Sequence, residues 1–487
     1  MEFEKEKLRF DVLEDVTLTA NVSAKEAVEE GWEVLAAEAS ACCLRAEMLS
    51  REAMAEGCVS FCIVLKDAEG HIRKVERNER FAVNEPMPGT DAKTVLLLRA
   101  SAEKTRACVE AGNLMLSCRV VLSGVRVVPC ETDVLAVPKD ETVRCRQKHL
   151  HTDRVLFAMP LRFSHAFSVA LSPRLPEARE VLCACASAYA QEVHLSAGQL
   201  VLGGKIALQT TYCSRDEYEP VLQVSDEEEF SQIVELTGSE EGGRAVVSLS
   251  VESVETAVCA NAEGENRVIE VKAQLCGYAL VVKSEETTAV IDAYALNAKL
   301  SCASEPIRFT GSLEPVSFSF SRSVSVRVPD GKPPVSRVNA VCFSPALTAD
   351  AADGSVKGCA ETAVLYMASG TGETEGFAQS IPIDFHDVFK PFDDEAEALL
   401  GQISLTDMQA VLISGREIEV RAGFAASFMP ITREDCAPVR DIAEEESVPS
   451  EWGIILYRVQ RGDTLWDICK QVCVDENDLL ALNPGIS

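Results

Sequence analysis

Four short sequence features recur three times in the same order, at intervals of roughly 150 residues. They are an apolar–basic–aromatic tripeptide, a glycine eight residues before a bulky apolar residue, a phenylalanine that ends an apolar segment, and a basic residue within a late apolar segment. In turn they read Leu8-Arg9-Phe10, Leu161-Arg162-Phe163 and Ile307-Arg308-Phe309; Gly57 with Leu65, Gly204 with Tyr212 and Gly358 with Tyr366; Phe81, Phe230 and Phe385; Arg119, Lys272 and Arg421. Because solenoid repeats are only ~20–50 residues long, this spacing predicts three whole domains, at 1–140, 155–302 and 305–440, each expected to fold by itself.

The local pattern within each copy is that of β-strands. Residues 246–255 alternate between apolar and polar side chains, and a glycine-bearing turn at 262–265 leads into a second such segment. This predicts half-buried strands joined in hairpins. Helical periodicity is limited to residues 24–34 and 396–400. We therefore expect a mainly β fold of three tandem, antiparallel, two-layer β domains.

The charge of the chain limits its partners. The 487 residues include 46 basic and 77 acidic ones, a net charge of −31, which disfavours nucleic acid and anionic membrane. The charge serves solubility, favours a basic protein partner, or does both. No apolar run approaches the ~20 residues of a membrane span. The N-terminus alternates charges from Glu2 to Lys7 and does not resemble a secretory signal, so a cytoplasmic protein is expected.

The nineteen cysteines do not resemble a disulfide framework. Most lie in apolar alternating segments, as Cys118 and Cys276 do, where a thiol acts as a small hydrophobe. We expect them to be reduced and mostly buried. Cys145, His149 and His151 lack a second pair of ligands at zinc-like spacing.

Motifs for catalysis or cofactor binding are missing. No Gly-x-Ser-x-Gly, P-loop, His-Glu-x-x-His or Cys-x-x-Cys sequence is present. We expect no enzymatic activity, no cofactor and no metal. The repeated basic residues Arg119, Lys272 and Arg421 fit solvent-facing strand positions better than a shared anion site.

The C-terminal end differs from the repeats. Residues 441–456 are acidic and aperiodic, which predicts a linker. A strand at 457–460 and a turn should follow. Thr464 and Asp467 then form a capping-box pattern at the start of a first helix. A second helix starts near Asp475 and should end at Asn483, because the next residue is Pro484.

Residues 457–468 and 479–486 resemble a LysM domain, a family that binds N-acetylglucosamine chains between two loops. The resemblance implies a binding groove lined by Gly462, Asp463, Thr464, Leu465, Asn483, Pro484, Gly485 and Ile486. Trp466 is expected to pack as an anchor between the helices. The sequence stops at Ser487, where the closing strand of the family should begin. We therefore expect an incomplete strand–helix–helix module. Either the chain is truncated or a partner completes the free edge. Glycan binding should then be weak or absent.

The repeats resemble the SPOCS domain of sporulation proteins, most clearly in copy two at residues 175–182 and in the hairpin at 264–275. Repeated SPOCS domains before one LysM domain is the arrangement of SipL-like spore coat morphogenetic proteins. The resemblance implies a non-enzymatic scaffold in the mother-cell cytoplasm, at the forespore surface, whose LysM end contacts the basement-layer ATPase of the coat. A peptidoglycan-binding, cell-wall-associated protein is the alternative, and a hydrolase fused to LysM fails for want of a catalytic group.

Overall fold

The protein is mainly β and antiparallel, as predicted. The computed structural model describes residues 3–49, 51–67, 69–88, 93–196, 198–215, 220–236, 243–392, 396–445 and 454–485. The strands are β1 (Phe3–Ala27), β2 (Glu33–Leu49), β3 (Glu52–Lys66), β4 (Ile72–Pro86), β5 (Val95–Glu110), β6 (Asn113–Pro138), β7 (Val143–Ala170), β8 (Ala178–Ser196), β9 (Gln199–Ser214), β10 (Val221–Glu235), β11 (Arg244–Cys259), β12 (Val268–Ala295), β13 (Lys299–Ser304), β14 (Ile307–Ser312), β15 (Val316–Arg327), β16 (Val335–Ala349), β17 (Val356–Ala368), β18 (Thr374–Phe385), β19 (Ala398–Ser414), β20 (Glu417–Cys436) and β21 (Val439–Glu445). Two helices follow, α1 (Leu465–Val472) and α2 (Glu476–Leu482).

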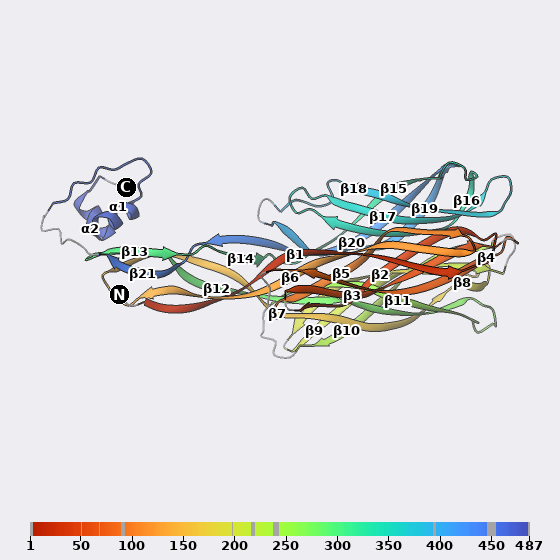
Figure 1. Cartoon of the computed structure of the whole chain (residues 1–487), viewed down its shortest axis with the longest axis horizontal. Coiled ribbons are helices and arrows are strands. Elements are labelled where there is room, and N and C mark those ends of the chain that lie inside the picture. The colour runs from red at the N-terminus through yellow and green to blue at the C-terminus, as the bar shows by residue number, and fades with distance from the viewer. Residues whose placement is uncertain are drawn as a thin grey trace.

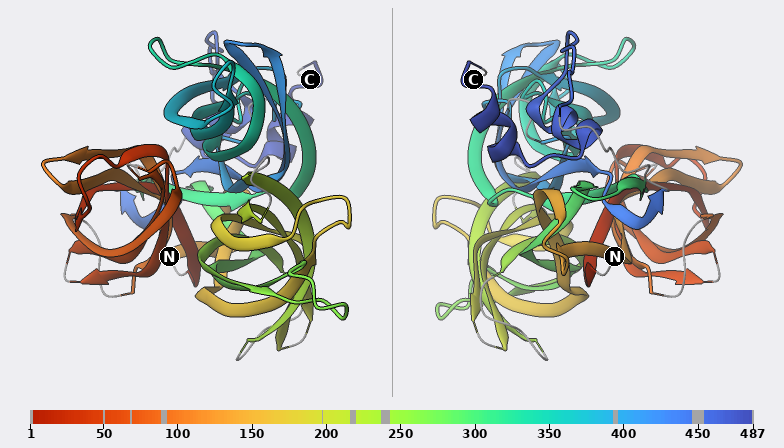
Figure 2. Two further views of the ribbon diagram at one scale, coloured as in Figure 1. Left: turned by 90° about the vertical axis from the view of Figure 1, so that its right-hand side faces the viewer. Right: turned by 90° about the vertical axis from the view of Figure 1, so that its left-hand side faces the viewer.

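One pattern of strand pairing occurs three times. In unit 1 (β1–β6), the sheet β1-β6-β5 faces the sheet β2-β3-β4. Unit 2 (β7–β12) has the sheets β7-β12-β11 and β8-β9-β10. In unit 3 (β14–β20), β14 and β15 both pair with β20, which also pairs with β19, and the second sheet is β16-β17-β18. Viewed along the long axis, the three units lie around a common centre (Figure 2).

The bulky apolar residue that follows the recurrent glycine occupies an equivalent core position in the three units. Tyr212 and Tyr366 are fully buried, and their hydroxyls donate to the carbonyls of Pro176 and Pro333 at 3.3 and 3.0 Å. These carbonyls belong to loops that precede the second sheet of each unit. Leu65 is also fully buried, as this position requires. The second repeated feature therefore marks a core position. In units 2 and 3 the tyrosine at this position also holds the loop before the second sheet by a hydrogen bond.

The first repeated tripeptide is not equivalent in the three units. The register places Asn21, Ala166 and Ser323 opposite the three repeated basic residues, and the tripeptides precede these positions by different distances. As a result Phe10 and Phe309 meet outside the unit cores, at 6.1 Å between ring centroids, whereas Phe163 packs inside unit 2. A three-residue match could not show this, because equivalence depends on strand register.

The units share buried surfaces in addition to their own cores. Each unit encloses apolar side chains between its two sheets. One shared cluster joins the second sheets at the centre, through Leu35, Leu182 and Leu365 among others. Two more clusters join all units further along the axis, and a third joins units 1 and 2 to β13 and β21. The expectation that each copy folds by itself therefore omits a substantial interface, which an isolated unit would expose to water.

A narrow stalk extends from the three units toward the C-terminal module (Figure 1). It consists of residues 3–13, 128–138, 143–155, 283–295, 299–312 and 431–445, in which long strands of all units run together. Residues 441–445, expected in the linker, belong to β21 and pair with β13. The rest of the expected linker up to residue 453 lies outside the described residues.

The helical periodicity at residues 24–34 and 396–400 corresponds to no helix. Residues 24–27 end β1 and residues 33–34 begin β2, while β19 begins at residue 398. Antiparallel pairing overrides the local periodicity in both places.

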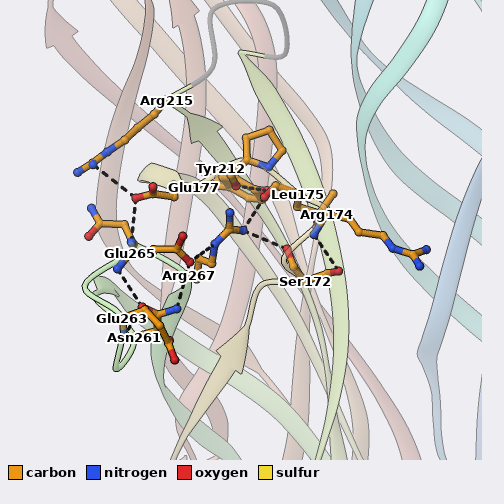
Figure 3. A network of polar contacts seen from close by, with 12 residues as sticks. Ser172, Arg174, Leu175, Glu177, Tyr212, Arg215, Asn261, Glu263, Glu265 and Arg267 are labelled. Carbon is orange, nitrogen blue, oxygen red and sulfur yellow. Dashed lines mark hydrogen bonds and ion pairs between the residues drawn. The ribbon is translucent and has the colours of Figure 1, made fainter.

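The two segments of unit 2 that resemble the SPOCS domain lie in contact at one end of the unit (Figure 3). The guanidinium of Arg267 donates to the carbonyls of Leu175 and Ser172 at 2.6 and 3.1 Å, and to the Glu265 carboxylate at 2.8 Å. Glu177 accepts from the backbone N–H of Asn266 at 3.0 Å. Arg267 thus holds the loop before β8 against the hairpin before β12.

The Arg267→Ala variant is expected to loosen this loop, because two carbonyls and one carboxylate lose a charged donor. The loss of hydrogen bonds to a charged group should destabilise the loop by about 1.5–3 kcal/mol. Faster hydrogen exchange at residues 171–177 would report it. Arg174→Ala, in the same loop but with an exposed side chain, is the control. Equal exchange in the two variants would contradict the role of Arg267.

Candidate binding site at the C-terminal module

The C-terminal module contains the two helices expected from its sequence. Thr464 caps α1 by accepting from the Asp467 backbone N–H, and the Asp467 carboxylate accepts from the Thr464 N–H, so the capping box is complete. Helix α1 ends at Cys473 in the left-handed conformation. Asp475 caps α2, which ends before Asn483. Local sequence determines these ends, because each cap satisfies backbone groups within its own turn.

Residues 457–460, expected to form a strand, form none. No strand among the described residues lies beside them to supply hydrogen bonds. The segment is held instead by Asp463, whose carboxylate accepts from the Tyr457 hydroxyl at 2.9 Å and from the Gln460 N–H at 2.8 Å. The predicted groove residue Asp463 therefore also closes its own loop.

The two predicted groove loops are exposed to solvent. In the first, Gly462 and Thr464 are exposed, and Asp463 and Leu465 are half-buried. Gly462 has a φ of 104°, a conformation that favours glycine. In the second loop Asn483, Pro484 and Gly485 are exposed. Ile486, also predicted to line the groove, lies outside the described residues.

An apolar edge leads into the module, formed by Ile454, Ile455, Leu456 and Val459. Leu456 is 95% exposed and Ile454 is 82% exposed. With Leu482 at the end of α2, the edge supplies five of the ten large apolar side chains that are exposed in the described residues. Such a concentration on so short a segment is typical of an interaction surface.

The module sits on the stalk through four residues that we call the seat: Arg144 and Arg146 of β7, and Asp292 and Tyr294 of β12. The indole Nε1 of Trp466 donates to Asp292 at 2.7 Å, and Lys470 Nζ lies 2.5 Å from the same carboxylate. Trp466 therefore joins α1 to β12, a contact that the sequence did not indicate. Its expected packing between the helices stays a prediction.

Further contacts complete the seat. The Tyr294 ring packs edge-on to Trp466 at 4.9 Å, and the Arg146 guanidinium lies 5.3 Å from the indole centroid. Arg144 donates to Asp475 at 2.7 Å and lowers the pKa of that carboxyl. The Tyr294 hydroxyl donates to the Val474 carbonyl at 3.1 Å.

The strand pairing explains how Asp292 reaches the module. The β12–β7 register shifts between Val290 and Asp292, and an irregularity of this kind re-aims the next side chain. The seat carries no sequence motif, since its residues lie in long alternating strands more than 170 residues before the module residues that they contact. Only the pairing of distant strands brings them together.

The remaining candidates from the sequence gain no functional arrangement. Lys272 and Arg421 are exposed, and each lies beside a glutamate, at 3.8 and 2.7 Å, as expected for solvent-facing strand positions. His149 and His151 are exposed, and with Cys145 they form no metal-ligating group within the described residues. No helix in the described part is both long and apolar enough to cross a membrane.

Comparison with known families identifies two segments. Residues 457–487 match the model of the LysM domain, and residues 177–258 match the model described as SipL, SPOCS domain. The second match spans β8 to β11, the strands that lie between β7 and β12 in chain order. Neither the curated proteins nor the solved structures contain a match. The two matches are consistent with a SipL-like protein, and these binding or scaffold domains support a spore-associated binding role.

Proposed function

We propose that this chain, with a SPOCS-matching unit and a LysM-matching end, is a non-enzymatic scaffold of spore coat assembly. Its C-terminal module binds a protein partner, which by resemblance to SipL-like proteins is the basement-layer ATPase of the coat. The protein then acts in the mother-cell cytoplasm at the forespore surface. The whole chain presents the module at the end of a stalk, away from the three units (Figure 1).

The apolar edge is the observation that supports a protein partner. Its backbone forms no strand and its side chains face water, so another chain can add a strand and cover the apolar groups at once. The net charge of −31 favours a partner with a basic surface. The seat keeps the edge at a fixed place on the stalk, which lowers the entropic cost of binding.

The Leu456→Asp variant of the full chain is expected to weaken binding to the ATPase by tenfold or more. Burying a leucine side chain contributes about 1.5–3 kcal/mol, and about 1.4 kcal/mol corresponds to tenfold. Binding is measured by calorimetry or by co-purification. Ile413→Asp is the matched control, because Ile413 is 55% exposed on β19 and lies outside the module. Equal affinity of both variants and the wild type would contradict the proposed edge.

Peptidoglycan binding is the alternative function, favoured by the LysM match and by the exposure of both groove loops. The same calorimeter distinguishes the two. We expect little or no heat of binding with chito-oligosaccharides. The reason is that the Asp463 carboxylate already accepts hydrogen bonds within its own loop, from Tyr457 and Gln460. Micromolar glycan affinity without binding to the ATPase would favour the cell-wall function.

A further inference from the structure

Four side chains with metal-ligating atoms converge where the three units meet. They are Glu38 of β2, Cys183 and Cys185 of β8, and Cys342 of β16. One ligand atom from each lies within 4.8 Å of all the others. The Sγ atoms of Cys183 and Cys185 are 3.5 Å apart, and they lie 3.1 and 2.6 Å from Glu38 Oε2. Each unit therefore contributes at least one ligand.

The topology explains this convergence. The strands β2, β8 and β16 are equivalent, each being the first strand of the second sheet in its unit. These sheets meet in the shared apolar cluster, which includes Cys183 and Cys342. Because side chains two residues apart point to the same face of a strand, Cys183 and Cys185 both reach the cluster.

We propose that Glu38, Cys183, Cys185 and Cys342 bind one Zn²⁺ ion, which fastens the three units together. Three thiolates and a carboxylate are ligands that zinc accepts in closed, four-coordinate structural sites. With Zn–S bonds of about 2.3 Å, the sulfur atoms of a tetrahedral site lie about 3.8 Å apart, close to the distance between Cys183 and Cys185. Binding releases the protons of the thiols to solvent.

Space, orientation and access fit this ion. A cavity of about 10 Å³, lined by Glu38, Cys183 and Cys342, has room for a single small occupant. The Ser344 hydroxyl donates to Glu38 Oε1 at 2.9 Å and so orients the carboxylate without being a ligand itself. Glu38 and Cys185 also line a larger cavity of about 580 Å³, which provides a route of entry.

The alternative is that these cysteines are small core hydrophobes beside a glutamate and bind no metal. Elemental analysis of the full chain, purified from zinc-supplemented cells, decides between the two. We expect about one zinc per chain, and near-complete loss of zinc in Cys185→Ala and Cys342→Ala. Cys213→Ala is the matched control, because Cys213 is buried in the same apolar cluster but is outside the ligand group. Zinc far below one equivalent in the wild type, or equal zinc in all variants, would overturn the proposal.

A second measurement does not depend on variants that fold. Wild-type chain stripped of metal is titrated with Co²⁺, which takes the same ligands and reports them by absorption. We expect a thiolate-to-cobalt charge-transfer band that saturates at about one equivalent, and a higher unfolding temperature in the metal-bound form. Absence of the charge-transfer band would refute thiolate ligation, even if some metal copurified.

Discussion

Replacing Asp292 with alanine is expected to detach the C-terminal module from the stalk while the three β units stay folded. The Asp292 carboxylate accepts from the Trp466 indole and from Lys470, so its loss leaves both donors without this acceptor. Charge-assisted hydrogen bonds contribute about 1.5–3 kcal/mol each, less where solvent screens them. A loss of about 2 kcal/mol lowers the ratio of attached to detached module about 30-fold.

Distances between spin labels on α1 and on β12 measure this detachment. The wild type should give one narrow distance distribution, and Asp292→Ala a broad one with an unchanged β-type circular dichroism spectrum. Glu286→Ala is the control, because Glu286 is an exposed carboxylate on the same strand that lies beside His151 and outside the seat. A narrow distance distribution in Asp292→Ala would contradict the prediction, because it would show that the other seat contacts are enough to hold the module on the stalk.

The Gly204→Ala variant is expected to destabilise unit 2 by about 3 kcal/mol or more, because a side chain there has no room. A Cβ at Gly204 would lie 2.4 Å from the Tyr189 carbonyl oxygen and 2.6 Å from the Phe230 ring. Both are held: Phe230 is buried directly opposite Gly204, and the Tyr189 carbonyl belongs to the paired strand β8. Backbone and packed ring must both shift to admit one methyl group.

The neighbouring residue supplies a matched control. The atoms nearest to a Cβ at Gly203 belong to Glu192, at 3.5 Å or more, which is ordinary van der Waals contact. Gly203→Ala should therefore change stability by less than about 0.5 kcal/mol. Thermal unfolding and limited proteolysis of the two variants test the difference. Equal unfolding temperatures would mean that the strand yields more easily than its packing indicates.

The repeated glycine, which is Gly204 in unit 2, shows that some repeated sequence features occupy equivalent structural positions and others do not. Gly57 and Gly204 lie directly opposite Phe81 and Phe230, so two of the repeated features form one cross-strand pair in units 1 and 2. In unit 3, Gly358 lies opposite Ile383 instead, and Phe385 is two residues further along. A spacing match of a few residues finds the strand but does not determine its register.

The cysteines also show what the sequence predicts and what only the structure reveals. Their apolar surroundings in the sequence predicted mostly buried thiols, but eight of the nineteen are buried, ten are half-buried and Cys108 is exposed. Their apolar alternation also hid the cluster with Glu38, since its ligands lie in three segments more than 140 residues apart. Zinc-like spacing along the chain cannot be seen when each ligand comes from a different unit.

The sequence by itself determined the strands, the hairpins and the two capped helices of this protein. Those features depend on the alternation of a few neighbouring residues or on caps within one turn, so they can be recognised locally. Only the tertiary structure decided that the three units share a core, that Trp466 joins α1 to β12, and that three units meet around Glu38. These outcomes depend on the register of strands far apart in the chain and on which faces they bury together, which no local pattern specifies.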